Sequence, residues 1–66
     1  MTAVIIKGRI ERDEALLATT KILRRIALDQ GEDYLAQLYA IDISHAEQRL
    51  ELHRGALGRA VEGTAR

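Results

Sequence analysis

The stretch YLAQLYAIDI, residues 34–43, decides the fold that we expect for this chain. Only Gln37 and Asp42 in it are clearly polar, so a helix through this stretch points apolar side chains in almost every direction. A helix that is apolar all round is a buried helix. The rest of the 66-residue chain, or another chain, must therefore supply the surface that covers it.

Length and composition leave few ways to stabilise this chain. Its 66 residues make one small domain, and such a domain buries only about 60% of the surface that its unfolded chain exposes. Below about 70–80 residues a core seldom supplies more than about 3–5 kcal/mol, so disulfides, a metal ion or a partner usually add to it. The chain has no Cys, Phe or Trp, which excludes disulfides and cysteine-ligated metals. Oligomerisation remains, and we expect a homodimer.

The charge balance and the apolar runs bear on partners and location. Ten basic and ten acidic residues cancel, whereas nucleic-acid-binding proteins usually present a net positive face to the phosphates. This balance disfavours nucleic acid as a partner. The uninterrupted apolar runs, such as residues 3–6, are no longer than four residues, far below the roughly 20 residues of a membrane-spanning helix or the 7–15 of a signal-peptide core. We therefore expect a cytoplasmic protein with no membrane partner.

Residues 1–11 are predicted to form an extended arm or strand. Val4, Ile5 and Ile6 are β-branched, and Gly8 interrupts the segment after them. No second strand candidate is present in the sequence. Because a lone strand leaves its backbone donors and acceptors unpaired, it must pair with a second copy, add to a partner's sheet, or remain a loosely packed arm.

A first helix is predicted over residues 13–30. Asp13 can cap its start, and Gly31 can adopt the left-handed conformation that ends a helix. Leu17 and Leu28 lie off its apolar stripe, and we interpret them as a secondary contact. The stripe itself, at helical spacing, contains Leu16, Thr19, Thr20, Ile22, Leu23, Ile26 and Ala27.

A second helix is predicted over residues 33–61, capped by Asp33. The short connection between the two helices favours an antiparallel hairpin. Glycines at positions 55, 58 and 63 each weaken a helix by about 1 kcal/mol relative to alanine, so residues 62–66 are predicted to be a frayed tail. Every third or fourth residue forms a seam like that of a coiled coil, namely Ala36, Tyr39, Ile43, Ala46, Leu50, His53, Leu57 and Ala60.

One neighbouring helix cannot cover both sides of residues 34–43, and a two-helix hairpin has no other interior. Two hairpins packed together form a four-helix bundle with a continuous core. We therefore expect a mainly α fold that dimerises in this way. The predicted dimer or partner interface comprises Leu35, Leu38, Tyr39, Ile41, Ile43, Ala46, Leu50, His53 and Leu57.

No catalytic, metal or cofactor motif is present. Asp42 and His45 are three residues apart and share a helix face, but the bundle metal sites use several such pairs on facing helices. Ser44 and His45 are adjacent, so on a helix they point about 100° apart, and no acid is placed to orient the imidazole. We predict that the chain is not an enzyme and binds no metal or cofactor.

The function predicted from these features is that of a small dimeric helical protein-interaction module with a regulatory or inhibitory role. The alternative is a DNA-binding transcriptional regulator or antitoxin. The order of strand, helix, glycine turn and helix over residues 2–45 resembles the layout of the ribbon-helix-helix family, which places paired strands in the major groove. That resemblance would direct three residues at the bases, namely Ile5, Lys7 and Arg9.

Two features depart from the ribbon-helix-helix layout. The first predicted helix is longer than that layout usually has. The second helix begins with Glu32 and Asp33, whose carboxylates would repel a phosphate at the positive end of the helix. Both departures disfavour the DNA-binding alternative.

Overall fold

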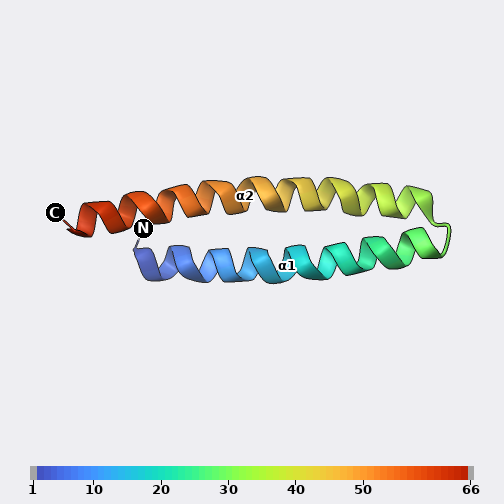
Figure 1. Cartoon of the computed structure of the whole chain (residues 1–66), viewed down its shortest axis with the longest axis horizontal. Coiled ribbons are helices and arrows are strands. Elements are labelled where there is room, and N and C mark those ends of the chain that lie inside the picture. The colour runs from blue at the N-terminus through green and yellow to red at the C-terminus, as the bar shows by residue number, and fades with distance from the viewer. Residues whose placement is uncertain (1, 66) are drawn as a thin grey trace.

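The protein is a hairpin of two long antiparallel helices (Figure 1). The computed structural model describes residues 2–65, and the side chains of residues 2–61. Helix α1 spans Ala3–Asp29 and helix α2 spans Asp33–Ala65, and no strand occurs within residues 2–65. The Cα atoms of the hairpin extend over 53 × 14 × 13 Å, and α2 extends past the start of α1 (Figure 1). The predicted helical hairpin is confirmed.

The predicted extended arm over residues 1–11 is wrong for the described part of that segment, because α1 begins at Ala3. Thr2 caps it, with its hydroxyl oxygen accepting a hydrogen bond from the backbone N–H of Ile5 at 3.4 Å. As part of a helix, Ile6 and Ile10 are buried and pack against Leu50 of α2. Burial of two isoleucines on a neighbouring helix outweighs the strand preference of β-branched residues, which is weak and depends on context.

The turn between the helices follows the prediction for Gly31. This residue has φ = 73°, and its N–H donates to the carbonyl oxygen of Leu28 at 3.1 Å. The N–H of Glu32 donates to the carbonyl oxygen of Ala27 at 2.9 Å. These are the two hydrogen bonds of a Schellman motif. They end α1 and let α2 begin at Asp33, as predicted.

The far end of α2 differs from the prediction. The helix continues to Ala65 instead of ending near residue 61, so the predicted frayed tail is helical in backbone up to residue 65. The last residue of the predicted tail, residue 66, lies outside the described residues.

On α2, the predicted seam is the surface that α1 covers. Ala36, Ala46 and Leu50 are buried, and the seam residues between and beyond them are half-buried, namely Tyr39, Ile43, His53, Leu57 and Ala60. Leu57 and Ala60 pack against the cluster of Ile6, Ile10 and Leu50. The spacing of three and four residues therefore predicted the correct face of α2.

On α1, the predicted apolar stripe coincides with the true contact at Thr20 and Ala27, which are buried, and lies to one side of it elsewhere. Asp13 and Thr20 are buried, and Leu17 packs against the core cluster. The seam runs from Ile6 through Ile10 at intervals of three and four residues, and adjacent positions on a helix differ by about 100°. Four residues of the predicted stripe are therefore turned outward and are 40–62% exposed, namely Leu16, Ile22, Leu23 and Ile26.

Candidate interaction surface

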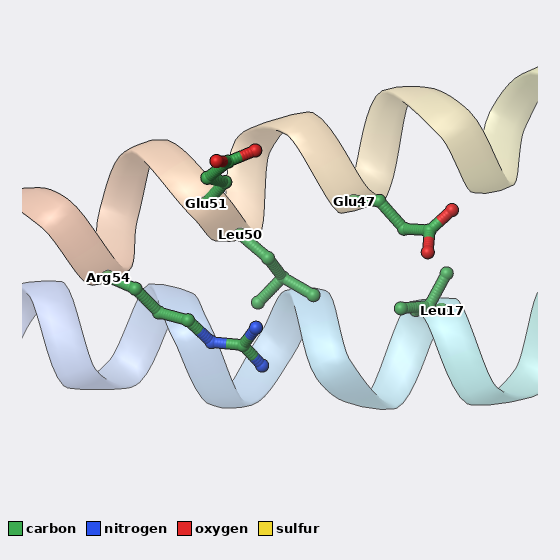
Figure 2. A pocket seen from close by; sticks show the side chains of 5 residues that line it. All are labelled: Leu17, Glu47, Leu50, Glu51 and Arg54. Atoms are coloured by element: carbon green, nitrogen blue, oxygen red, sulfur yellow. The ribbon is translucent and has the colours of Figure 1, made fainter.

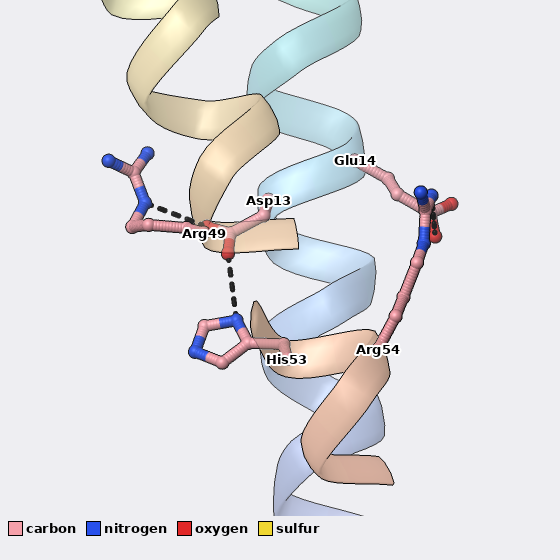
Figure 3. A network of polar contacts seen from close by, with 5 residues as sticks. All are labelled: Asp13, Glu14, Arg49, His53 and Arg54. Atoms are coloured by element: carbon pink, nitrogen blue, oxygen red, sulfur yellow. Dashed lines mark hydrogen bonds and ion pairs between the residues drawn. The ribbon is translucent and has the colours of Figure 1, made fainter. Parts of the chain in front are cut away.

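A polar cluster interrupts the apolar seam (Figure 3). Asp13, only 8% exposed, places one carboxylate oxygen 3.1 Å from Nδ1 of His53 and the other 3.7 Å from Nε of Arg49. His53 lies in the seam as predicted. Its partner was missed because Asp13 was assigned to a helix start. Asp13 follows Ile10 by three residues, an interval typical of a helical seam. This spacing could have predicted that the carboxylate lies in the seam.

The two long sides of the hairpin can be told apart by their ion pairs. Arg49 meets Asp13 on one side, whereas on the other side Arg54 meets Glu14 at 3.5 Å (Figure 3). We call these the Arg49 side and the Arg54 side. Residues seven positions apart on a helix lie on nearly the same face, so these four residues assign the remaining side chains to one side or the other.

The Arg54 side carries a groove with a rim of mixed charge. Figure 2 shows Leu50 pointing from α2 toward α1, with Leu17 on the facing helix. Around these leucines lie the carboxylates of Glu47 and Glu51 and the guanidinium of Arg54. The rim therefore carries two negative charges and one positive charge around an apolar floor.

The Arg49 side carries a second groove, which brings Asp42 and His45 together as their spacing predicted. Leu16, Thr20 and Arg49 complete its lining. The guanidinium beside Asp42 and His45 disfavours a bound cation there by charge repulsion. Within the described residues, no set of three or more His, Cys, Asp or Glu side chains is placed to hold a metal ion.

The Arg49 side is also the more apolar one. Leu16 and Leu23 are seven residues apart on α1, and Leu38 and Leu52 flank His45 at the same interval on α2. All four leucines are exposed, and Leu52 reaches 70%. Together with two neighbours they form a surface that we call the apolar face, made of Leu16, Leu23, Ile26, Leu35, Leu38 and Leu52.

The structure divides the predicted interface residues into two groups. Leu35 and Leu38 belong to the apolar face, and Ile41 lies on the side of α2 remote from α1. The others lie in the seam with α1 of the same chain, namely Tyr39, Ile43, Ala46, Leu50, His53 and Leu57. The surface that remains for another chain is therefore narrower than the sequence suggested.

The remaining candidate residues are spread over α1. Leu17 is part of the intramolecular core, whereas Leu28 is exposed and lines a groove with Lys21, Arg24 and Arg25. The residues that the DNA-binding alternative directs at the bases are exposed on the first two turns of α1, namely Ile5, Lys7 and Arg9.

Comparison with protein-family models, with curated proteins and with solved structures found no match for this chain. Among the described residues, neither helix has a stretch that is both long enough and apolar enough to cross a lipid bilayer.

Proposed function

We propose that this chain is a non-catalytic protein-interaction module that works as a homodimer of helical hairpins, in a regulatory or inhibitory role. The observation that carries the proposal is the imbalance between its core and its surface. The described core buries three large apolar side chains, those of Ile6, Ile10 and Leu50, together with three alanines. Among residues 2–61, twelve large apolar side chains remain exposed.

The position of the exposed side chains supports self-association. The apolar face gathers them on one side of the hairpin, and contiguous exposed apolar patches of this kind mark interaction sites. Covering it with a second hairpin would give each chain the continuous core of a four-helix bundle. This also supplies the support that a chain of this size, with no cysteine, otherwise lacks.

Other apolar side chains would stay exposed after such dimerisation. Ile22, Tyr34 and Ile41 lie away from both the seam and the apolar face. Tyr34 is 77% exposed, and a tyrosine offers a large contact area at low entropic cost. These exposed residues support the proposal that the dimer also binds a different protein.

The DNA-binding alternative depends on a strand at residues 2–10. These residues lie in or cap α1, so within the described part of the chain the ribbon has no counterpart. On a helix Ile5 and Arg9 are about 40° apart and share a face, whereas Lys7 lies about 160° from each of them, on the opposite side. We therefore retain the interaction module as the proposal.

Thermal unfolding across a hundredfold range of protein concentration tests the proposal. If the folded unit is a dimer, mass action makes Tm rise with concentration. Circular dichroism at 222 nm follows the loss of helix in each sample. A Tm that stays constant over the range would show that the hairpin folds as a monomer and would refute the homodimer.

A further inference from the structure

The apolar face has a self-complementary order along α2. Leu35, Asp42, Arg49 and Ala56 recur every seven residues. Residues of α2 at equal distances on either side of a midpoint beside His45 are complementary. Apolar residues correspond to apolar residues, and an acid corresponds to a base. Leu38 corresponds to Leu52, and Asp42 corresponds to Arg49.

One further symmetric pair lies on α1, at the same level of the hairpin. Leu16 and Leu23 are equidistant from a midpoint between Thr19 and Thr20. Thr20 and His45 line one groove, so the two midpoints lie side by side across the hairpin. A single two-fold axis can therefore serve both helices, as an interface between identical copies requires.

We infer that the partner on the apolar face is a second copy of this chain, related by a two-fold axis that crosses the hairpin at the level of Thr20 and His45. This inference rests on the proposed homodimer and adds its face and orientation. The two copies lie antiparallel, with α1 on α1 and α2 on α2. Leu16 then faces Leu23 of the second copy, Leu38 faces Leu52, and Asp42 faces Arg49.

Charge decides between the two symmetric orientations. In a parallel pair, α1 of one copy would lie over α2 of the other at the same level. Because Leu16 shares a groove with Arg49, this arrangement would set Leu16 against a guanidinium and give Asp42 no cation from the second copy. Removing a charged group from water without adding a partner for it is unfavourable. The antiparallel pair matches leucine with leucine and carboxylate with guanidinium.

The ends of the hairpin also match in the antiparallel pair. Arg9 and Arg59 lie near the open end, and the turn at the other end carries Asp29, Glu32 and Asp33. Rotation about the two-fold axis brings Arg9 and Arg59 of each copy toward the turn of the other. These contacts are favourable in sign for Glu32 and Asp33, whereas Asp29 already pairs with Arg25 of its own chain.

Arg49 can take part in the dimer without leaving its own chain. Nε of its guanidinium approaches Asp13, and Figure 3 shows the two terminal nitrogens on the side of the guanidinium away from Asp13. A guanidinium has five N–H donors in a planar fork. It can therefore bridge Asp13 of its own chain and Asp42 of the second copy.

The size of the overlapping face fits a stable dimer. An axis beside His45 overlaps α2 with its copy over residues 33–58, about 39 Å of helix, and two helices of about 10 Å diameter make the face about 20 Å wide. The resulting area of about 800 Å² matches the roughly 800 Å² per partner of a stable interface. Overlap of only the halves near the turn would supply about half of this area, so the longer antiparallel overlap is favoured.

Disulfide trapping tests this arrangement directly, because the chain has no cysteine of its own. Leu38→Cys and Leu52→Cys proteins are prepared separately, mixed, and oxidised with oxidised glutathione. Within one chain the two positions are about 21 Å apart along the helix, beyond the roughly 7 Å between Cα atoms that a disulfide spans. Any disulfide between them therefore joins two copies.

A matched control pair uses the neighbouring positions on the other side of α2, Gln37→Cys and Glu51→Cys. At micromolar protein we expect the Leu38→Cys and Leu52→Cys mixture to form its mixed disulfide about a hundredfold faster than the control pair, since positions held in a complex meet at a millimolar effective concentration. Circular dichroism of the reduced proteins checks that each variant keeps its helix content.

A second pair, Leu16→Cys with Leu23→Cys, tests α1 independently and is expected to crosslink equally fast. Crosslinking of both pairs at the rate of the control would overturn the inferred face and orientation. If the melting temperature of the wild-type protein still rises with concentration, the proposed homodimer would stand and would use another surface. A concentration-independent melting temperature would remove both proposals.

Discussion

Replacing Asp13 should destabilise the hairpin far more than replacing its neighbour Glu14. The Asp13 side chain is 11% exposed, and its hydrogen bond to His53 is 3.1 Å long. A bond of this kind to a charged group contributes about 1.5–3 kcal/mol. The pair with Arg49 is longer and half-exposed, and such pairs add at most about 1 kcal/mol. We therefore expect Asp13→Ala to lower the free energy of unfolding by about 2–3 kcal/mol.

Glu14→Ala is the matched control, because Glu14 also meets an arginine across the hairpin. Both side chains of that pair are more than half exposed, so its loss should change stability by less than about 0.5 kcal/mol. Urea denaturation followed by circular dichroism, at one fixed protein concentration, gives both values. Equal effects of Asp13→Ala and Glu14→Ala would show that the buried carboxylate contributes no more than a surface ion pair.

Three further predictions concern the core, the turn and the apolar face. Leu50→Asp, which buries a carboxylate in the core cluster, should abolish the helical circular dichroism signal at micromolar protein; a helical variant would mean that the seam is placed wrongly. Gly31→Ala should lower the free energy of unfolding by about 1–2 kcal/mol, because φ at this position is 73°. Gly8→Ala, which adds a methyl group in open space on a helix, should raise it by about 0.5–1 kcal/mol. Thermal melts in which both variants shift in the same direction would contradict this account. Leu38→Asp should raise the dissociation constant of the dimer at least tenfold, as measured by light scattering on dilution, because it would bury an unpaired charge. The helix content should stay intact at high concentration. An unchanged dissociation constant would place the interface elsewhere.

The sequence predicted α2 better than α1, for a physical reason. The seam of α2 repeats over nearly four heptads, from Ala36 to Ala60, and leaves little choice of face. In α1 the three β-branched residues at positions 4–6 favour a strand locally. Only contact with α2 reveals that Ile6 and Ile10 belong to a helical seam.

The misplaced start of α1 had consequences further along the chain. It made Asp13 a helix cap instead of the partner of His53. It also directed Leu16 and Leu23 toward α2, whereas the structure turns both outward. The apolar face could therefore not be predicted from the sequence. Its residues on α1 can be identified only when the side of α1 that contacts α2 is known, and the wrong start of α1 led to the wrong side.

The molar mass of the wild-type protein in solution tests the central claim, self-association through the apolar face, most directly. Light scattering on dilution from millimolar to low micromolar protein measures it. We expect a mass of twice 7.4 kDa at the higher concentrations, with dissociation toward the monomer only on dilution. A mass of 7.4 kDa throughout, with full helix content, would contradict the account, because the apolar face would then be stable in water without a second copy.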